Sequence, residues 1–129
     1  MIASTGMANG MNATGLRPSP FRISAQPTEV ELLAKYFRVL ADASRLRILE
    51  ALAAGEELSV GEIVERLGIA QPSVSNHLAC LRWCGFVATR REHRTVYNRI
   101  ADARVARLVE LARALLEGNE EHVASCRRT

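Results

Sequence analysis

Two short helical patterns separated by a glycine constrain the fold of this chain more than any other stretch. Ser59 and Glu62 stand three positions apart, the spacing of a capping box, in which each side chain accepts a hydrogen bond from the other residue's backbone N–H. Apolar residues then recur at helical spacing up to Gly68, which predicts a short helix ending at that glycine. Pro72 suits the first turn of a second helix, predicted over residues 72–84. Two short helices joined by such a turn predict a helix-turn-helix.

A basic β-hairpin is predicted directly after the second helix. Residues 86–91 and 95–100 supply β-branched and aromatic side chains on both sides of a three-residue connection. Arg90, Arg91 and Arg94 lie near its predicted tip. A basic hairpin in this place forms a wing, so the predicted fold class is mainly α with a small β-hairpin, a winged helix-turn-helix.

Further helices are predicted on both sides of this unit. Each begins at a capping residue, and two of them end at a glycine. The predicted caps and ends are Thr28 with Glu31, Asp42 or Ser44 with Gly55, and Asp102 with Gly118. We therefore expect one domain over residues 28–117, a disordered tail over residues 1–27, and a flexible C-terminal tail over residues 118–129.

Composition limits the cellular setting and the chemistry. Aromatic residues make up only 5% of the 129 residues, so the core is expected to be mainly aliphatic. The chain has no apolar run of about 18 residues and no pattern typical of a signal peptide, which predicts a cytoplasmic protein without a membrane span. In that reducing compartment, three cysteines indicate metal binding or reactive thiols rather than disulfides.

The second predicted helix has an apolar side and a polar side. At about 100° per residue, Val74, Leu78 and Leu81 form one buried stripe, and Ser73 and Asn76 fall away from its middle. Polar side chains at the start of such a helix can reach base edges in a major groove, and the hairpin arginines can contact phosphates. Two plainer interpretations remain open. The polar side can be an ordinary solvated face, and the excess of Arg can reflect a GC-rich genome.

Two of the cysteines lie on the same predicted helix. Cys80 and Cys84 are four residues apart, so their side chains are neighbours on or beside the polar face. A pair of thiols is an incomplete site for a soft metal ion, and Cys126 in the tail is the predicted third ligand, with His122 and His77 as alternatives. The competing interpretation is that each cysteine is a small buried apolar residue.

Two stretches resemble the ArsR/SmtB family of metalloregulators. They are Leu40-Ala41-Asp42-Ala43-Ser44-Arg45-Leu46-Arg47-Ile48-Leu49 and Gln71-Pro72-Ser73-Val74-Ser75-Asn76-His77-Leu78. The resemblance implies a homodimeric winged-helix repressor that dimerises through its first and last helices and binds an inverted-repeat operator. It implies DNA contacts by residues of the recognition helix, which with the wing give the candidate set Gln71, Ser73, Ser75, Asn76, His77, Arg90, Arg91 and Arg94.

Members of this family carry metal sites at different positions, and two of the known site types are missing from this sequence. Ser59-Val60-Gly61 stands where the arsenic- and cadmium-type site has Cys-Val-Cys, and Asp102-Ala103-Arg104 lacks the histidine of the zinc-type site. The stretch from Asn76 to Gly85 instead resembles CmtR-type cadmium/lead sensors, which implies a site made by Cys80, Cys84 and Cys126. Cd(II) or Pb(II) is the inducer that this resemblance implies, with As(III) and Zn(II) as alternatives.

Other functional classes remain open at this point. The same thiols could serve a winged-helix regulator that senses oxidants or sulfide, or they could be purely structural. An enzyme is disfavoured, because the sequence has no nucleophile–base arrangement, phosphate-binding loop or hydrolytic metal motif.

Overall fold

The computed structural model describes residues 26–127, which form six helices and three strands. In chain order these are α1 (Glu29–Leu40), α2 (Ala43–Leu52), β2 (Leu58–Ser59), α3 (Val60–Leu67), α4 (Gln71–Trp83), β3 (Val87–Glu92), β4 (Thr95–Ile100), α5 (Ala103–Glu117) and α6 (Glu120–Ser125). The chain divides after Leu32 into two units, and the second, Leu33–Thr129, carries the helix-turn-helix and the wing. The predicted N-terminal tail lies almost entirely outside the described residues.

Local capping interactions start most of the helices where the sequence predicts them. Thr28 and Glu31 exchange hydrogen bonds of 2.7 and 3.2 Å at the start of α1. Ser59 and Glu62 form the same capping box at the start of α3. The carboxylate of Asp42 accepts from the N–H of Arg45 at 3.0 Å, so Asp42 rather than Ser44 is the N-cap of α2.

The end of α2 differs from the prediction. The helix ends at Leu52, and its C-cap is Ala53 in a right-handed conformation. Gly55, with φ of 81°, comes two residues later, where its N–H donates to the carbonyl of Leu52 at 3.2 Å. A tight turn therefore closes this helix before the glycine is reached.

The strands form a small antiparallel sheet in the order β2-β4-β3. The predicted hairpin is confirmed, but Glu92 belongs to β3 and pairs with Thr95, which leaves His93 and Arg94 as the turn. His93 adopts φ of 58°, a value that residues other than glycine seldom take. The sequence did not predict β2, because a two-residue strand is too short to show alternation.

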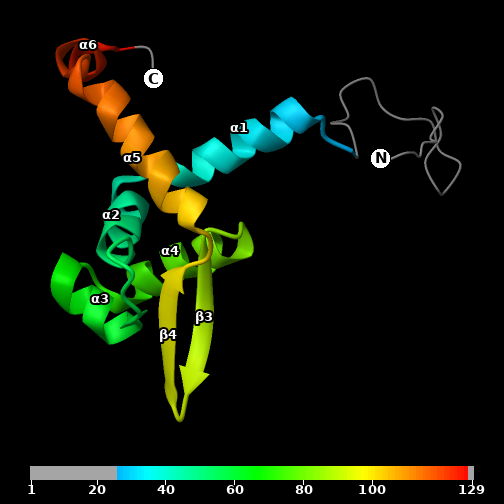
Figure 1. Cartoon of the computed structure of the whole chain (residues 1–129), viewed down its shortest axis with the longest axis vertical. Coiled ribbons are helices and arrows are strands. Elements are labelled where there is room, and N and C mark those ends of the chain that lie inside the picture. Colours follow the sequence, from blue (N-terminus) through cyan, green and yellow to red (C-terminus); the bar gives the residue numbers. More distant parts are fainter. Residues whose placement is uncertain (1–25, 128–129) are drawn as a thin grey trace, which may run out of the picture. The chain divides into compact units, whose positions relative to one another are not determined.

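The core lies where α2, α3 and α4 meet the base of the sheet, with α5 leading away from it (Figure 1). It is mainly aliphatic, as composition predicted. Its buried apolar members are Val39, Leu40, Ile48, Leu49, Leu52, Leu58, Ile63, Val74, Leu78, Leu81, Phe86, Val87 and Val105. The ring of Phe86 packs against Tyr36 at a centroid distance of 4.2 Å.

The C-terminal segment contains a helix that the sequence did not predict. α6 begins after Asn119, whose side chain makes no capping hydrogen bond. None of its residues is buried, and a helix of six residues is too short to show a clear apolar period in the sequence. Across residues 26–127, no helix is both long enough and apolar enough to span a membrane.

Candidate nucleic-acid interface and thiol pair

The predicted apolar stripe anchors α4 in the domain. Val74 and Leu81 are fully buried and Leu78 is 2% exposed, as the helical spacing predicts. Pro72 lies in the first turn, and Ala70 at the N-cap offers no side-chain acceptor. The helix is therefore held by packing along one side, while its opposite side is free to meet a partner.

The predicted DNA-contacting side chains divide into exposed and partly covered groups. Gln71, Ser73, Ser75 and Asn76 are exposed on the first half of α4. His77 is half-buried, and its Nδ1 accepts a hydrogen bond of 3.1 Å from Nε of Arg45. With Nδ1 as the acceptor, a neutral His77 carries its proton on Nε2.

Arg45 connects three helices. Besides its bond to His77 in α4, its Nη1 donates to the carbonyl of Val39 in α1 at 3.1 Å. Arg45 itself lies in the first turn of α2, where its backbone N–H donates to the capping carboxylate of Asp42. In the sequence, Arg45 stands out only as part of a family motif. Its partner lies 32 positions away, a distance at which no local pattern reveals the pairing.

The three arginines of the wing have different surroundings. Arg91 and Arg94 are exposed, and neither takes part in an ion pair within residues 26–127. Arg90 instead pairs with Glu57 at 2.7 Å and with Glu92 at 2.6 Å. The sequence predicted DNA contacts for all three arginines. Of these three, Arg91 and Arg94 lack a carboxylate partner in the described part of the chain, whereas Arg90 has two.

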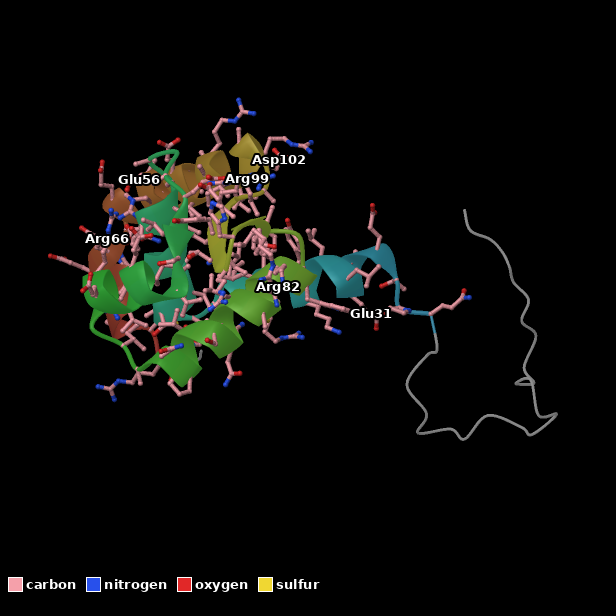
Figure 2. All side chains as sticks on the ribbon, turned by 90° about the horizontal axis from the view of Figure 1, so that it is seen from below. Glu31, Glu56, Arg66, Arg82, Arg99 and Asp102 are labelled. Carbon is pink, nitrogen blue, oxygen red and sulfur yellow. The ribbon has the colours of Figure 1, made fainter. Side chains whose placement is uncertain are left out.

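Other exposed charges flank these elements. Arg82 points outward from the second half of α4 (Figure 2). Glu56, which precedes β2, and Arg66 of α3 form an exposed ion pair of 2.7 Å; both residues are labelled in Figure 2. Arg82 is thus an exposed basic side chain of α4 itself, whereas Arg66 is engaged by Glu56.

The structure brings Cys80 and Cys84 together on α4. Both are free thiols, both are half-buried, and both pack against the hydrophobic core rather than lying wholly on the polar face. Burial, followed by the neighbouring Cys80 thiol, raises the pKa of Cys84, while the charges of Lys35 and Arg45 act in the opposite direction. The pair of sulfur donors has the softness that thiophilic ions prefer.

Cys126 does not join that pair within one chain. It is exposed at the C-cap of α6, and Figure 1 shows α6 at the end of α5 remote from α4. Among the residues that the structure describes, no three His, Cys, Asp or Glu side chains are arranged to hold a metal ion. Within residues 26–127, Cys80 and Cys84 at the end of α4 therefore stand as a pair of thiols with no third such side chain beside them.

An apolar groove runs between α1, α2 and α5. Its volume is about 470 Å³, and Phe37, Leu46, Leu108 and Leu116 are among its lining residues. Phe37 is 49% exposed and Leu116 is 40% exposed, which is high for large apolar side chains. This face is available for burial against another protein surface.

Comparison with known proteins agrees with this architecture. The protein-family model for bacterial regulatory proteins of the arsR family matches residues 42–89 of this chain, from the cap of α2 into β3. A probable mercury resistance operon repressor from Streptomyces lividans is 44% identical over 101 residues, which cover 78% of this chain and 80% of that protein. The transcriptional regulator CmtR of Mycobacterium tuberculosis is 45% identical over 85 residues, which cover 65% of this chain and 71% of that one.

A solved structure extends the likeness to the fold. It is the homodimeric winged helix-turn-helix DNA-binding domain of a possible ArsR-family regulator from Mycobacterium bovis, with 32% identity and a TM-score of 0.65. The match covers 77% of this chain and 95% of that one. The fold, the helix-turn-helix and these relatives agree, and the chain belongs to the ArsR family of bacterial DNA-binding transcriptional regulators rather than to a class of enzymes.

Proposed function

We propose that this regulator is a metal-responsive repressor. In this proposal a homodimer binds an inverted-repeat operator in the absence of metal and leaves it when a thiophilic ion binds Cys80, Cys84 and Cys126. The observation that carries the proposal lies on α4, where an exposed polar face and a pair of free thiols occupy successive turns of one helix.

The DNA-binding part of the proposal rests on exposure and charge. Gln71, Ser73, Ser75 and Asn76 extend from the start of α4, where they can reach base edges in a major groove. His77 can contribute through Nε2, because Arg45 occupies only its Nδ1. Arg91 and Arg94 extend from the wing without carboxylate partners among the described residues and can contact the DNA backbone.

The homodimer provides the spacing that such an operator requires. Two recognition helices related by a two-fold axis read half-sites about 34–36 Å apart, one turn of DNA. The apolar groove between α1, α2 and α5 supplies surface that a second copy can bury. The related Mycobacterium bovis domain is homodimeric, which supports the same assembly here.

The metal part of the proposal rests on donor chemistry. Thiolates favour soft ions, so Cd(II) and Pb(II) are the proposed inducers, and arsenite and Zn(II) are rivals. The Streptomyces lividans relative is a probable mercury resistance repressor, which adds Hg(II) to the ions to be tested. Because Cys126 is remote from α4 in its own chain, we propose that it comes from the partner subunit, held there by the C-terminal tail.

One titration tests these statements together. Reduced full-length protein, bound to a labelled duplex that the apo protein selects from a random pool, is titrated with each ion. Thiolate-to-metal absorption and DNA anisotropy are followed in parallel. We expect Cys80→Ser and Cys84→Ser to bind the duplex like wild type but not to release it at the wild-type metal concentration. Ser125→Ala, next to Cys126, is the control and should behave like wild type.

The same experiment separates the alternatives. Cys126→Ser should lower metal affinity at least about tenfold if a third thiolate is a ligand, and should change nothing if the pair acts alone. Release of the Cys80→Ser or Cys84→Ser protein at the wild-type metal concentration would show that the site assignment is wrong. Release by peroxide or polysulfide without any metal would favour the thiol-oxidation alternative.

A further inference from the structure

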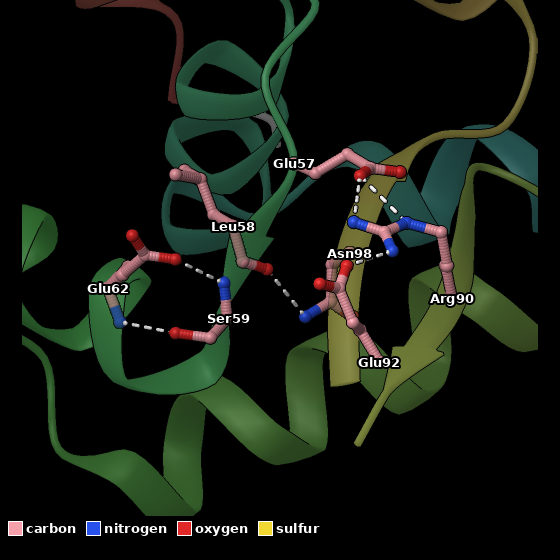
Figure 3. A network of polar contacts seen from close by, with 7 residues as sticks. All are labelled: Glu57, Leu58, Ser59, Glu62, Arg90, Glu92 and Asn98. Carbon is pink, nitrogen blue, oxygen red and sulfur yellow. Dashed lines mark hydrogen bonds and ion pairs between the residues drawn. The ribbon is translucent and has the colours of Figure 1, made fainter. Parts of the chain in front are cut away.

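We propose that Arg90 positions the wing and does not contact DNA phosphates. Its guanidinium donates from Nε and Nη2 to the same oxygen of Glu57, at 2.9 and 2.7 Å, and from Nη1 to Glu92 at 2.6 Å (Figure 3). The guanidinium carbon also lies 5.1 Å from the centroid of the Tyr97 ring. Two carboxylates and one aromatic face therefore surround this cation.

Local charge argues against a phosphate contact at this residue. One arginine and two glutamates give the group Arg90, Glu57 and Glu92 a formal charge of −1. The hydrogen bond from Arg90 holds the pKa of Glu57 below its ordinary value, so Glu57 is ionised at neutral pH. Three of the five N–H donors of the guanidinium are taken by these carboxylates, so a phosphate could meet only the remaining two, beside two negative charges.

Strand geometry separates Arg90 from its neighbour. In β3, successive side chains point to opposite faces, so Arg90 and Glu92 share one face while Arg91 lies on the other. Arg90 pairs with Tyr97 in the hairpin register, and Arg91 pairs with Val96. Arg91 therefore lies on the face away from the Arg90 network.

A continuous set of contacts runs from Arg90 to the helix-turn-helix. Glu57 directly precedes β2, where the carbonyl of Leu58 accepts from Nδ2 of Asn98 in β4 at 3.0 Å. The next residue, Ser59, is the N-cap of α3 (Figure 3). The bonds between Arg90 and Glu57 thus fix the hairpin to the segment that starts the first helix of the helix-turn-helix. In this proposal they restrain the direction of the wing relative to the helix-turn-helix.

The test depends only on the DNA-binding half of the proposed function and uses the full-length apo protein. Affinity for the selected duplex is measured from 50 to 300 mM salt for Arg90→Gln and Glu57→Gln. Arg91→Gln and Arg94→Gln are the matched controls. Each phosphate contact contributes about 0.9 to the slope of log K against log salt concentration. We expect the two controls each to reduce the slope by about that amount.

Arg90→Gln and Glu57→Gln should behave alike. Both should weaken binding about three- to tenfold at 100 mM salt without changing the slope, and the double variant should be no weaker than Arg90→Gln alone. Amide hydrogen exchange at residues 91–95 should accelerate in these two variants and not in Arg91→Gln, while circular dichroism stays at the wild-type level.

The opposite pattern would overturn the proposal. If Arg90 contacts phosphate, Arg90→Gln lowers the slope by about 0.9, and Glu57→Gln strengthens binding because it frees the guanidinium. A wild-type protein that binds no duplex at any salt concentration would instead refute the DNA-binding half of the proposed function, which is a different result.

Discussion

The substitution Asn98→Asp should make folding stability depend on pH in one direction. Asn98 is the one buried polar residue among residues 26–127, with 2% of its surface exposed, and its Nδ2 donates to the carbonyl of Leu58. Aspartate has nearly the same shape but, when ionised, only accepts hydrogen bonds. An oxygen would then face the Leu58 carbonyl at the present separation of 3.0 Å.

The size of the effect follows from the cost of protonation. A buried carboxylate is disfavoured by several kcal/mol, but the variant can avoid this penalty by keeping the introduced carboxyl group protonated. From an unfolded pKa of about 3.9, protonation costs about 1.4 kcal/mol per pH unit, or about 4 kcal/mol at pH 7 and about 1.5 kcal/mol at pH 5. The protonated carboxyl can donate its O–H to Leu58, so little further penalty is expected.

The sign is fixed by linkage. The folded-state pKa of the introduced carboxyl is raised above its unfolded value, so the folded protein binds the extra proton and the variant loses stability as pH rises above about 4. Urea unfolding at pH 5 and pH 7, at one protein concentration, should give a destabilisation that is about 2.5–3 kcal/mol larger at pH 7.

Asn76→Asp provides the matched control for this experiment. It makes the same chemical change at an exposed position of α4 and should stay within about 0.5 kcal/mol of wild type at both pH values. Equal destabilisation of the Asn98→Asp variant at pH 5 and pH 7 would refute the assigned hydrogen bond and the burial argument together.

Three further outcomes are expected. Because burial raises the pKa of Cys84, its thiol is protonated at neutral pH, so metal affinity measured by chelator competition should increase between pH 6 and 8, and less steeply in Cys84→Ser. Ser59→Ala removes the α3 cap and should lower the free energy of unfolding in urea by about 1 kcal/mol, whereas the exposed Ser73→Ala should not. Leu116→Glu in the apolar groove should shift sedimentation equilibrium toward monomer, and Val123→Glu on α6 should not.

Features that depend on local spacing could be predicted from the sequence. The stripe of Val74, Leu78 and Leu81 follows from helical geometry, and so does the neighbouring placement of Cys80 and Cys84. The capping boxes are equally local, because each joins residues only three positions apart. These elements define the helix-turn-helix and the helix that carries the thiols.

Features that depend on distant pairs could not be predicted in this way. Arg45 meets His77 across 32 positions, and Arg90 meets Glu57 across 33. Strand alternation places Arg90 and Arg91 on opposite faces, but only the folded sheet shows that Glu57 lies on the face of Arg90. The half-buried position of Cys80 and Cys84 also depends on tertiary packing, since the helical wheel placed them beside the polar face.

The link through Arg45 bears on how a ligand at the thiols could influence DNA binding. Cys80 lies one turn beyond His77, and His77 is tied through Arg45 to the end of α1 and the start of α2. A ligand shifts a conformational equilibrium only by the difference in its affinity for the two states. On the proposed function, that difference can arise within α4 itself and in its bonds to two neighbouring helices, without a long path through the domain. The thermodynamic coupling is reciprocal, so operator DNA must weaken metal binding by the same factor by which metal weakens DNA binding.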